Sequence, residues 1–459
     1  MRDLFFIAFL AAMFALGLKR PFILVLVYAY IDIVSPQRLS YYLLNAIPIS
    51  LIAFAAAVVG WLVFDDKKDC RLSRRQLLLV ALLLYCGYTT LHADFPIEAR
   101  TKWDWVWKAL LFAIFLPLTL RTKLRLEALA LVMVLCAGTI IITGGIKTVL
   151  GGGGYGTLRL MVDNNSGLFE GSIISTVAIA IIPLILYLSR HGTVFPPDWR
   201  VRTFAYCFCG ACLLMPIGTE ARTGLVCAAV LAIMMWWQTK RRMLYAAAGV
   251  LAMICAIPFL PSSFTQRMDT ISQYQADESA STRLQVWKWT LDYVARNPLG
   301  GGFDNYLQNS FTYHTVQKSG TPDNQRVEHV VVTDRGRAYH SSYFEMLGEQ
   351  GFPGLLLWLA LNLGTLVQSE RLRRRYKDSD NPDYQWVAPF ARAMVQGHII
   401  YLVGSLFVGI AYQPFVFMLI ALQIGATTYT RRRWQAESWR PMRAPVAATG
   451  GVAGPIAAD

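Results

Sequence analysis

The sequence predicts an all-α polytopic membrane protein with about 12 transmembrane helices and one large outward loop late in the chain. Three observations predict this class. Of the 459 residues, 55% are hydrophobic and only 16% are charged, whereas a soluble protein of this length would need a more polar surface. The mean hydropathy is +0.40. Apolar runs of roughly 20 residues, the length that spans a bilayer as a helix, recur along the chain.

Thirteen apolar runs are candidate spans. They are 3–18, 21–35, 43–64, 76–92, 104–120, 126–144, 170–189, 203–218, 223–239, 243–260, 342–367, 389–411 and 414–430. The first two are short and meet at "GLKRP" (17–21), so we interpret one of them as a partial or re-entrant helix. This interpretation gives twelve spans and an N-terminus inside the cell. Thirteen spans would place the N-terminus outside.

The distribution of charge predicts the orientation. The net charge is +14, and the excess is concentrated in short loops, as is typical of the cytoplasmic side of a membrane protein. We therefore expect no nucleic-acid partner. The loops predicted to lie inside are 67–75, 121–125, 190–202, 240–242, 368–388 and 431–433. The loops predicted to lie outside are 93–103, 145–169, 219–222 and 261–341.

The chain is expected to divide into four parts. These are N-terminal membrane helices (1–260, about ten runs), the large outward loop (261–341), C-terminal membrane helices (342–430) and a basic cytoplasmic tail (431–459). Unlike the inside loops, the outward loop is balanced in charge, with eight Lys or Arg and eight Asp or Glu. Its polar composition makes it the one large soluble element.

Short amphipathic helices are expected inside this loop. In "STRLQVWKWTLDYVARNPLGGGF" (281–303), Ser281 or Thr282 is predicted to cap a helix that "NPLGGG" ends. One face would carry Leu284, Trp287, Leu291 and Val294 and would lie on the bilayer surface. The glycine runs 151–154 and 300–302 are interpreted as flexible links, with close approach to a ligand as the alternative.

Three polar residues on the outward side are candidates for a site. Arg222 lies in the very short turn "GTEARTG" (218–224), and Arg283 opens the amphipathic helix. A guanidinium presents a planar fork of donors that suits phosphate oxygens, although an arginine at a bilayer surface also meets lipid head groups. His340, at the mouth of the span 342–367, titrates near neutrality and can act as a general base.

Other interpretations of these residues are weaker. His314, His329 and His340 lack the spacing of a compact zinc motif, and "CFCGAC" (207–212) lies in an apolar run without a nearby histidine. No metal or cofactor is therefore expected. Glu345 and Glu349 would lie on other helical faces than His340, so they are expected to anchor the end of the helix rather than to partner the histidine.

The order of three motifs resembles the bacterial O-antigen ligase and O-antigen polymerase superfamily. The motifs are "EARTG" (220–224), "STRLQVWKWTLDYVARNPLGGGFDNY" (281–306) and "HSSYFEMLGEQGFPG" (340–354). The N-terminal "MRDLFFIAFL" is similar to that of O-glycosylation ligases. "HSS" stands where "HN" is common in the superfamily. The resemblance implies a multi-pass protein of the Gram-negative inner membrane that resembles lipid-dependent integral-membrane glycosyltransferases.

The resemblance also implies an activity. An O-antigen ligase would transfer a glycan from undecaprenyl pyrophosphate to lipid A–core at the periplasmic face, without a metal and with inversion. Arg222, Arg283 and His340 match the superfamily's essential residues; Arg159, Arg337 and Lys147 are secondary candidates for binding the pyrophosphate. An O-antigen polymerase or a protein O-glycosylation ligase would use the same donor. A lipid-glycan transporter or flippase is the alternative from a different class.

Overall fold

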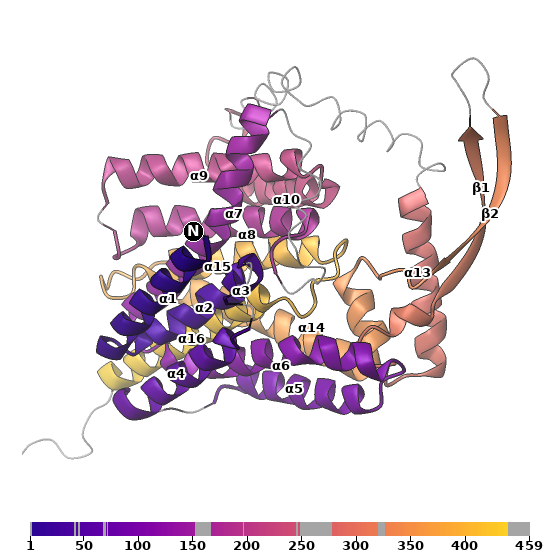
Figure 1. Cartoon of the computed structure of the whole chain (residues 1–459). Coiled ribbons are helices and arrows are strands. Elements are labelled where there is room, and N and C mark those ends of the chain that lie inside the picture. The colour runs from indigo at the N-terminus through magenta and orange to yellow at the C-terminus, as the bar shows by residue number, and fades with distance from the viewer. Residues whose placement is uncertain are drawn as a thin grey trace, which may run out of the picture.

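The computed structural model describes residues 2–40, 43–44, 46–67, 70, 72–151, 167–195, 197–244, 247, 278–319 and 326–438. Its helices pack side by side into a helical body, from one side of which the helix 278–296 and the strands 310–319 and 326–335 project (Figure 1). Most of the described elements are helices, which confirms an α-helical membrane protein.

The N-terminal half contributes nine of these helices. They are α1 (Arg2–Lys19), α2 (Phe22–Val34), α3 (Pro36–Leu39), α4 (Ile49–Phe64), α5 (Arg74–Leu91), α6 (Pro96–Thr119), α7 (Lys123–Gly151), α8 (Gly171–His191) and α9 (Trp199–Gly218). The later elements are α10 (Arg222–Gln238), α13 (Glu278–Arg296), η3 (Asn305–Gln308), β1 (Ser310–Ser319), β2 (Arg326–Arg335), α14 (Ser342–Tyr376), α15 (Val387–Gly404) and α16 (Pro414–Ser438).

The predicted apolar runs coincide with these helices, except that run 243–260 lies almost wholly outside the described residues. Within the described ranges, four helices are long and apolar enough to cross a membrane: α7, α8, α9 and α14. The helices α2, α4 and α10 are apolar but shorter. A count of twelve spans therefore remains a prediction.

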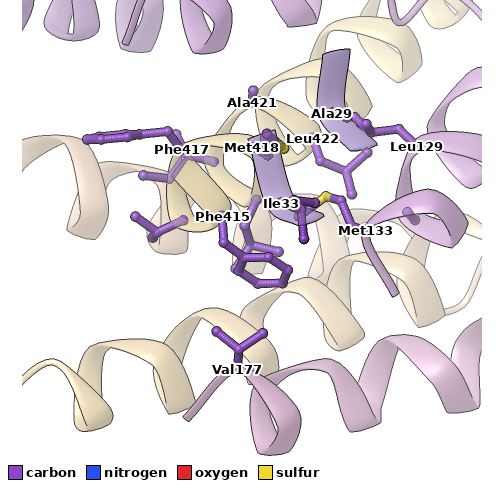
Figure 2. Packing of buried hydrophobic residues seen from close by; sticks show 14 of the residues in the cluster. Ala29, Ile33, Leu129, Met133, Val177, Phe415, Phe417, Met418, Ala421 and Leu422 are labelled. Carbon is purple, nitrogen blue, oxygen red and sulfur yellow. The ribbon is translucent and has the colours of Figure 1, made fainter. Parts of the chain in front are cut away.

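The core of the bundle is built around α16. Phe415, Phe417 and Leu422 of this helix are fully or almost fully buried, and Ile33 of α2 and Met133 of α7 lie beside it (Figure 2). Because α16 also packs against α6, α14 and α15, it connects the two halves of the chain. Burial of such side chains stabilises the packing of helices once they are formed.

The loops predicted to lie inside meet at one end of the bundle. The Asp65 carboxylate after α4 accepts two hydrogen bonds of 2.6 Å from Arg125 at the start of α7. Tyr384, between α14 and α15, donates to Glu437 at the end of α16 at 2.7 Å. These contacts agree with the prediction that these loops share one side of the membrane.

The loops predicted to lie outside meet at the other end. The Asp94 amide after α5 donates to the Gly301 carbonyl at 2.9 Å, and the Tyr293 hydroxyl of α13 donates to the Asp94 carboxylate at 2.6 Å. The loops predicted to lie inside and those predicted to lie outside thus gather at opposite ends of the bundle. Which group faces the periplasm remains a prediction, as do the four proposed parts of the chain.

The helix α13 differs from its prediction in two respects. It begins at Glu278, so Ser281 and Thr282 lie within its first turn and do not cap it. The side chains that it buries include Val286, Thr290 and Val294, whereas Leu284 and Leu291 of the predicted face are about half exposed. The buried face packs against α14 and includes a threonine. Contact of Leu284 and Leu291 with the bilayer surface remains a prediction.

A β-hairpin is an exception to the predicted all-α fold. Strands β1 and β2 pair antiparallel, from Ser310 opposite Arg335 to Ser319 opposite Arg326. The expectation of short amphipathic helices in the outward loop did not include these strands; its described residues hold the long helix α13, the short helix η3 and this hairpin. The β-branched residues of "RVEHVVVTDR" favour a strand, and a search for helical periodicity overlooks them.

The glycines 300–302 are not a flexible link. Gly300 has a φ of +84°, and the amides of Gly301 and Gly302 donate to the carbonyls of Gly348 and Glu349 at 3.1 and 2.9 Å. The segment therefore lies backbone to backbone against α14, where Gly351 (φ 61°) kinks that helix. The run 152–154 lies outside the described residues.

Gly300→Ala is expected to destabilise the protein. The added Cβ would lie 2.4 Å from the Gly351 nitrogen and 2.6 Å from the Glu349 oxygen, which are backbone atoms that cannot simply rotate away. The positive φ alone costs about 1–3 kcal/mol for a residue other than glycine. Thermal unfolding in detergent would measure the loss. Gly364→Ala is the control, because its Cβ would meet nothing within 4 Å; equal melting of the two variants would contradict this account.

Candidate active site

His340 lies in the short connection between β2 and α14, at the end of the bundle where the predicted outward loops meet. Its φ of 48° is in the left-handed region, which is uncommon for a residue other than glycine, and the residue is exposed. Within the described ranges, no hydrogen bond to its imidazole is found. An unusual backbone angle of this kind is often retained at functional sites.

The segment after His340 is fixed to the rest of the bundle by Ser342. Its amide donates to the Ser405 carbonyl at 2.8 Å, and its hydroxyl donates to Val408 at 2.9 Å. The same hydroxyl oxygen accepts from the Ile410 amide at 2.9 Å. Ser342, the second serine of "HSS", therefore attaches the start of α14 to the connection between α15 and α16. This attachment holds the nearby His340 in place.

The helix α13 is held against the same connection. The Trp287 indole donates to the carbonyl of Tyr339 at 2.9 Å and stacks on Phe344, with ring centroids 4.8 Å apart. Arg283 precedes Trp287 by four residues and so lies one helical turn away on the same face. The contact of Trp287 with the residue before His340 thus brings Arg283 to the histidine.

The charges around His340 affect its protonation. Although the residue is open to solvent on one side, the surrounding protein removes water from the ring, and this is the largest effect lowering the pKa of His340 from 6.5. The positive charge of Arg283 lowers it further, Glu170 opposes the change, and Arg337 adds to it. A lowered pKa keeps the imidazole neutral, which is the form that accepts a proton.

Arg222 lies beside the N-terminus of α8, where Glu170 is found. It is the first residue of α10, three residues after Thr219. Thr219 shares a hydrogen bond of 2.7 Å with Ser175, and a Cβ on Gly171 would lie 3.2 Å from it. Since Glu170 caps α8 and also acts on His340, Arg222 and His340 border the same end of α8.

The secondary candidates are placed differently from one another. Arg337 lies near His340 but also forms an ion pair with Asp334. Lys147 is exposed near the end of α7, next to Thr148, whose hydroxyl oxygen would be 2.0 Å from a Cβ on Gly218. It therefore belongs to the same end of the bundle as Arg222. Arg159 lies outside the described residues.

A buried ionic cluster was missed by the sequence interpretation. Lys102 of α6 approaches Glu349 at 2.7 Å, Glu345 at 2.9 Å and Asp304 at 3.5 Å. Glu349 has no exposed surface. The expectation that the two glutamates anchor the helix end rather than partner His340 is confirmed, because they bind Lys102 and the backbone amides of Asp304 and Ala411.

This cluster lies behind the candidate site and not in it. A cavity of about 290 Å³ is lined by Lys102, Asp304, Tyr306 and Glu345. The Tyr306 ring contacts that of Tyr339, the residue before His340, edge to face at 5.6 Å. The spacing of four residues between Glu345 and Glu349 could have predicted this cluster from the sequence. It places both carboxylates on one helical face, and two buried carboxylates need a nearby cation.

The part of the chain that is described offers no cluster of three or more His, Cys, Asp or Glu side chains placed to hold a metal ion. Of the "CFCGAC" cysteines, Cys207 is exposed and Cys212 is buried, and both lie on α9 with free thiols. The fold and the candidate site therefore define a helical membrane protein that carries basic residues and a histidine at one end of its bundle.

Comparison with known families identifies the kind of protein more closely. Residues 205–359 match the family model described as O-Antigen ligase, and residues 1–193 match a family of unknown function, DUF5935. The match over residues 205–359 supports the O-antigen ligase superfamily, which the motifs of the chain indicated. The matched range 205–359 includes Arg222, Arg283 and His340. No curated protein matches the sequence significantly. The family implies a membrane-bound ligase or polymerase activity of the glycosyltransferase type.

Proposed function

We propose that the protein is an O-antigen ligase, which transfers a glycan from undecaprenyl pyrophosphate to lipid A–core at the periplasmic face of the Gram-negative inner membrane. The observation that carries this proposal is the position of Arg283 beside His340, held there by the Trp287–Tyr339 hydrogen bond of 2.9 Å. A phosphate-binding cation next to a neutral base is what a transfer from a pyrophosphate to a hydroxyl requires.

The proposed mechanism is a single displacement. Arg222 and Arg283 bind the donor pyrophosphate and stabilise the negative charge that develops as it leaves. His340 removes the proton of the acceptor hydroxyl, whose oxygen attacks the anomeric carbon from the opposite face. The bond from that carbon to the pyrophosphate oxygen breaks, so the anomeric configuration inverts. These steps require no metal. Lys147, Arg159 and Arg337 would extend the phosphate-binding surface.

The acceptor distinguishes the ligase from its alternatives. Purified protein would be given undecaprenyl-pyrophosphate glycan with lipid A–core, with a second lipid-linked glycan or with a pilin-like protein, each in the presence of EDTA. Product with lipid A–core is the expected result. Product only with the second glycan would identify a polymerase, and product only with the protein a protein O-glycosylation ligase. Activity lost in EDTA and restored by a divalent ion would contradict the metal-free mechanism.

A transporter would need no transfer chemistry. Of the polar residues deep in the helices, His398 is buried; its Nε2 donates to the side-chain oxygen of Asn362 at 2.9 Å, and its Nδ1 accepts from the side-chain nitrogen of Gln423 at 3.0 Å. These three side chains satisfy one another, which is a structural role. Movement of the donor across vesicles without formation of any glycan product would favour the transporter.

The acid limb of the pH profile is expected to lie below pH 6.5. Because the pKa of His340 is lowered in the folded protein, the base stays neutral until the pH falls through that lowered value, and activity declines only there. Arg283→Gln removes a positive charge that lowers this pKa, so the acid limb should move upward. The profile of kcat/KM, which reports the free enzyme, would measure both. If the acid limb moved upward in Lys288→Gln but not in Arg283→Gln, the assignment of this limb to His340 beside Arg283 would be contradicted.

A further inference from the structure

A second site is suggested by a cavity at the opposite end of the same helices. A cavity of about 420 Å³ lies between the C-terminal ends of α8 and α10, the end of α14 and the start of α15. Three of these helices, α8, α10 and α14, begin at the His340 end of the bundle. The cavity is therefore separated from the candidate active site by the length of a helix.

The charge of this cavity is positive. Arg190, Lys377 and Arg392 line it, together with His191, and its lining contains no aspartate or glutamate. Within the described ranges, none of the first three is ion-paired with a carboxylate. Three cations from three separate helices at one cavity attract an anion, and no acidic side chain of the lining satisfies them.

The carboxylate of the adjoining cavity is already occupied. Asp378 and Asp380, next to the lining residues Lys377 and Ser379 in the chain, are exposed and do not line the cavity. Glu370 lines an adjoining cavity of about 190 Å³, which Arg392 also lines. Its two carboxylate oxygens accept hydrogen bonds of 2.7 Å from Arg373 and Arg374. Glu370 is thus bound on both oxygens by its own helix, and the guanidinium of Arg392 lies at the boundary between the two cavities.

The rest of the lining is mixed. Pro183 and Leu186 of α8, Met235 of α10 and Pro389 of α15 contribute apolar surface, and polar side chains such as Gln238, Gln385 and Gln396 lie among them. A lining that combines cations with apolar side chains fits an amphiphile whose head is anionic. A free inorganic anion would gain nothing from the apolar side chains. The cavity also lies at the end where the basic loops gather, next to the leaflet that would supply such lipids.

We propose that this cavity binds the phosphate head group of an anionic phospholipid, with Arg190, Lys377 and Arg392 donating to the phosphate oxygens and the acyl chains leaving along Leu186 and Met235. Guanidinium and ammonium groups at the cytoplasmic ends of membrane helices commonly bind such head groups. The site is distinct from the proposed transfer site and does not depend on the activity assigned to it.

The test compares lipids on the full-length purified protein. Phosphatidylglycerol, phosphatidylcholine and inorganic phosphate would each be added to protein in detergent, and binding would be measured by native mass spectrometry and by the rise in melting temperature. Phosphatidylglycerol should bind and stabilise, and phosphatidylcholine should not. Stabilisation by inorganic phosphate equal to that by phosphatidylglycerol would overturn the lipid assignment and indicate a free anion.

Matched variants locate the binding. Lys377→Gln/Arg392→Gln removes two cations of the cavity and should weaken phosphatidylglycerol binding at least about tenfold, because hydrogen bonds to a charged group are lost. Lys240→Gln/Arg241→Gln removes the same charge from exposed residues at the same end that do not line the cavity. This control should bind within about twofold of the wild type. Equal binding by the two double variants would overturn the proposal.

Discussion

Replacing His340 with alanine is expected to lower the rate of glycan transfer by about 10²–10⁴-fold, the usual contribution of a general base. The ring is exposed, and its lowered pKa, to which the neighbouring guanidinium of Arg283 contributes, keeps the imidazole in the neutral form that can accept a proton. The variant should fold, since no hydrogen bond to the imidazole is found within the described residues. Transfer would be measured at equal abundance in the membrane.

A second histidine at the same end supplies the control for this prediction. His92, directly after α5, is also exposed, and within the described residues its ring contacts only the carbonyl and the ring of Tyr88, one helical turn earlier. His92→Ala should therefore keep transfer activity within about twofold of the wild type. Full activity of His340→Ala at normal abundance would show that the proposed mechanism is wrong.

Replacing Lys102 with methionine is expected to have the largest effect on stability. Methionine keeps most of the length and apolar volume of the lysine stem but removes the ammonium group that Glu345 and Glu349 approach at 2.9 and 2.7 Å. Breaking a buried ion pair by removing one partner costs about 3–5 kcal/mol, because an uncompensated buried charge remains. Unfolding in detergent, followed by loss of monodisperse protein, would measure this loss.

Neutralising the carboxylates should restore part of that stability. In the triple variant Lys102→Met/Glu345→Gln/Glu349→Gln, two of the three orphaned charges are absent and only that of Asp304 remains, so much of the destabilisation should disappear, because the effects of residues in contact are coupled. Asp104→Asn, at an exposed position of α6, is a single-charge control outside the cluster. If Lys102→Met unfolded no more easily than Asp104→Asn, the cluster would not stabilise the fold.

The sequence predicted the helical elements well because each is an apolar run bounded by charge, and such runs have few alternatives in a membrane. The β-hairpin and the buried face of α13 were not predicted, because both depend on which neighbour covers a segment and not on its own period. The glycines 300–302 illustrate the same limit. Their role depends on the kink at Gly351, some fifty residues later in the chain.

For the candidate site, the sequence indicated residue types and their membrane side, while the structure added their neighbours. Arg283 could not be placed beside His340 from spacing alone, because the pairing rests on Trp287 and the carbonyl of Tyr339. Lys102 was overlooked because a lysine among tryptophans at the start of a span has an ordinary interfacial explanation. Only its contacts with Glu345 and Glu349 reveal the buried cluster.

Binding of the lipid-linked donor to three single variants tests the central claim most directly. The claim is that Arg222 and Arg283 hold the pyrophosphate while His340 acts on the acceptor. Arg222→Ala and Arg283→Ala should each weaken donor binding by about tenfold or more, because each removes charged hydrogen bonds worth about 1.5–3 kcal/mol. His340→Ala should bind the donor as the wild type does and fail to transfer it. Wild-type donor binding in both arginine variants, with weakened binding in His340→Ala, would contradict the account.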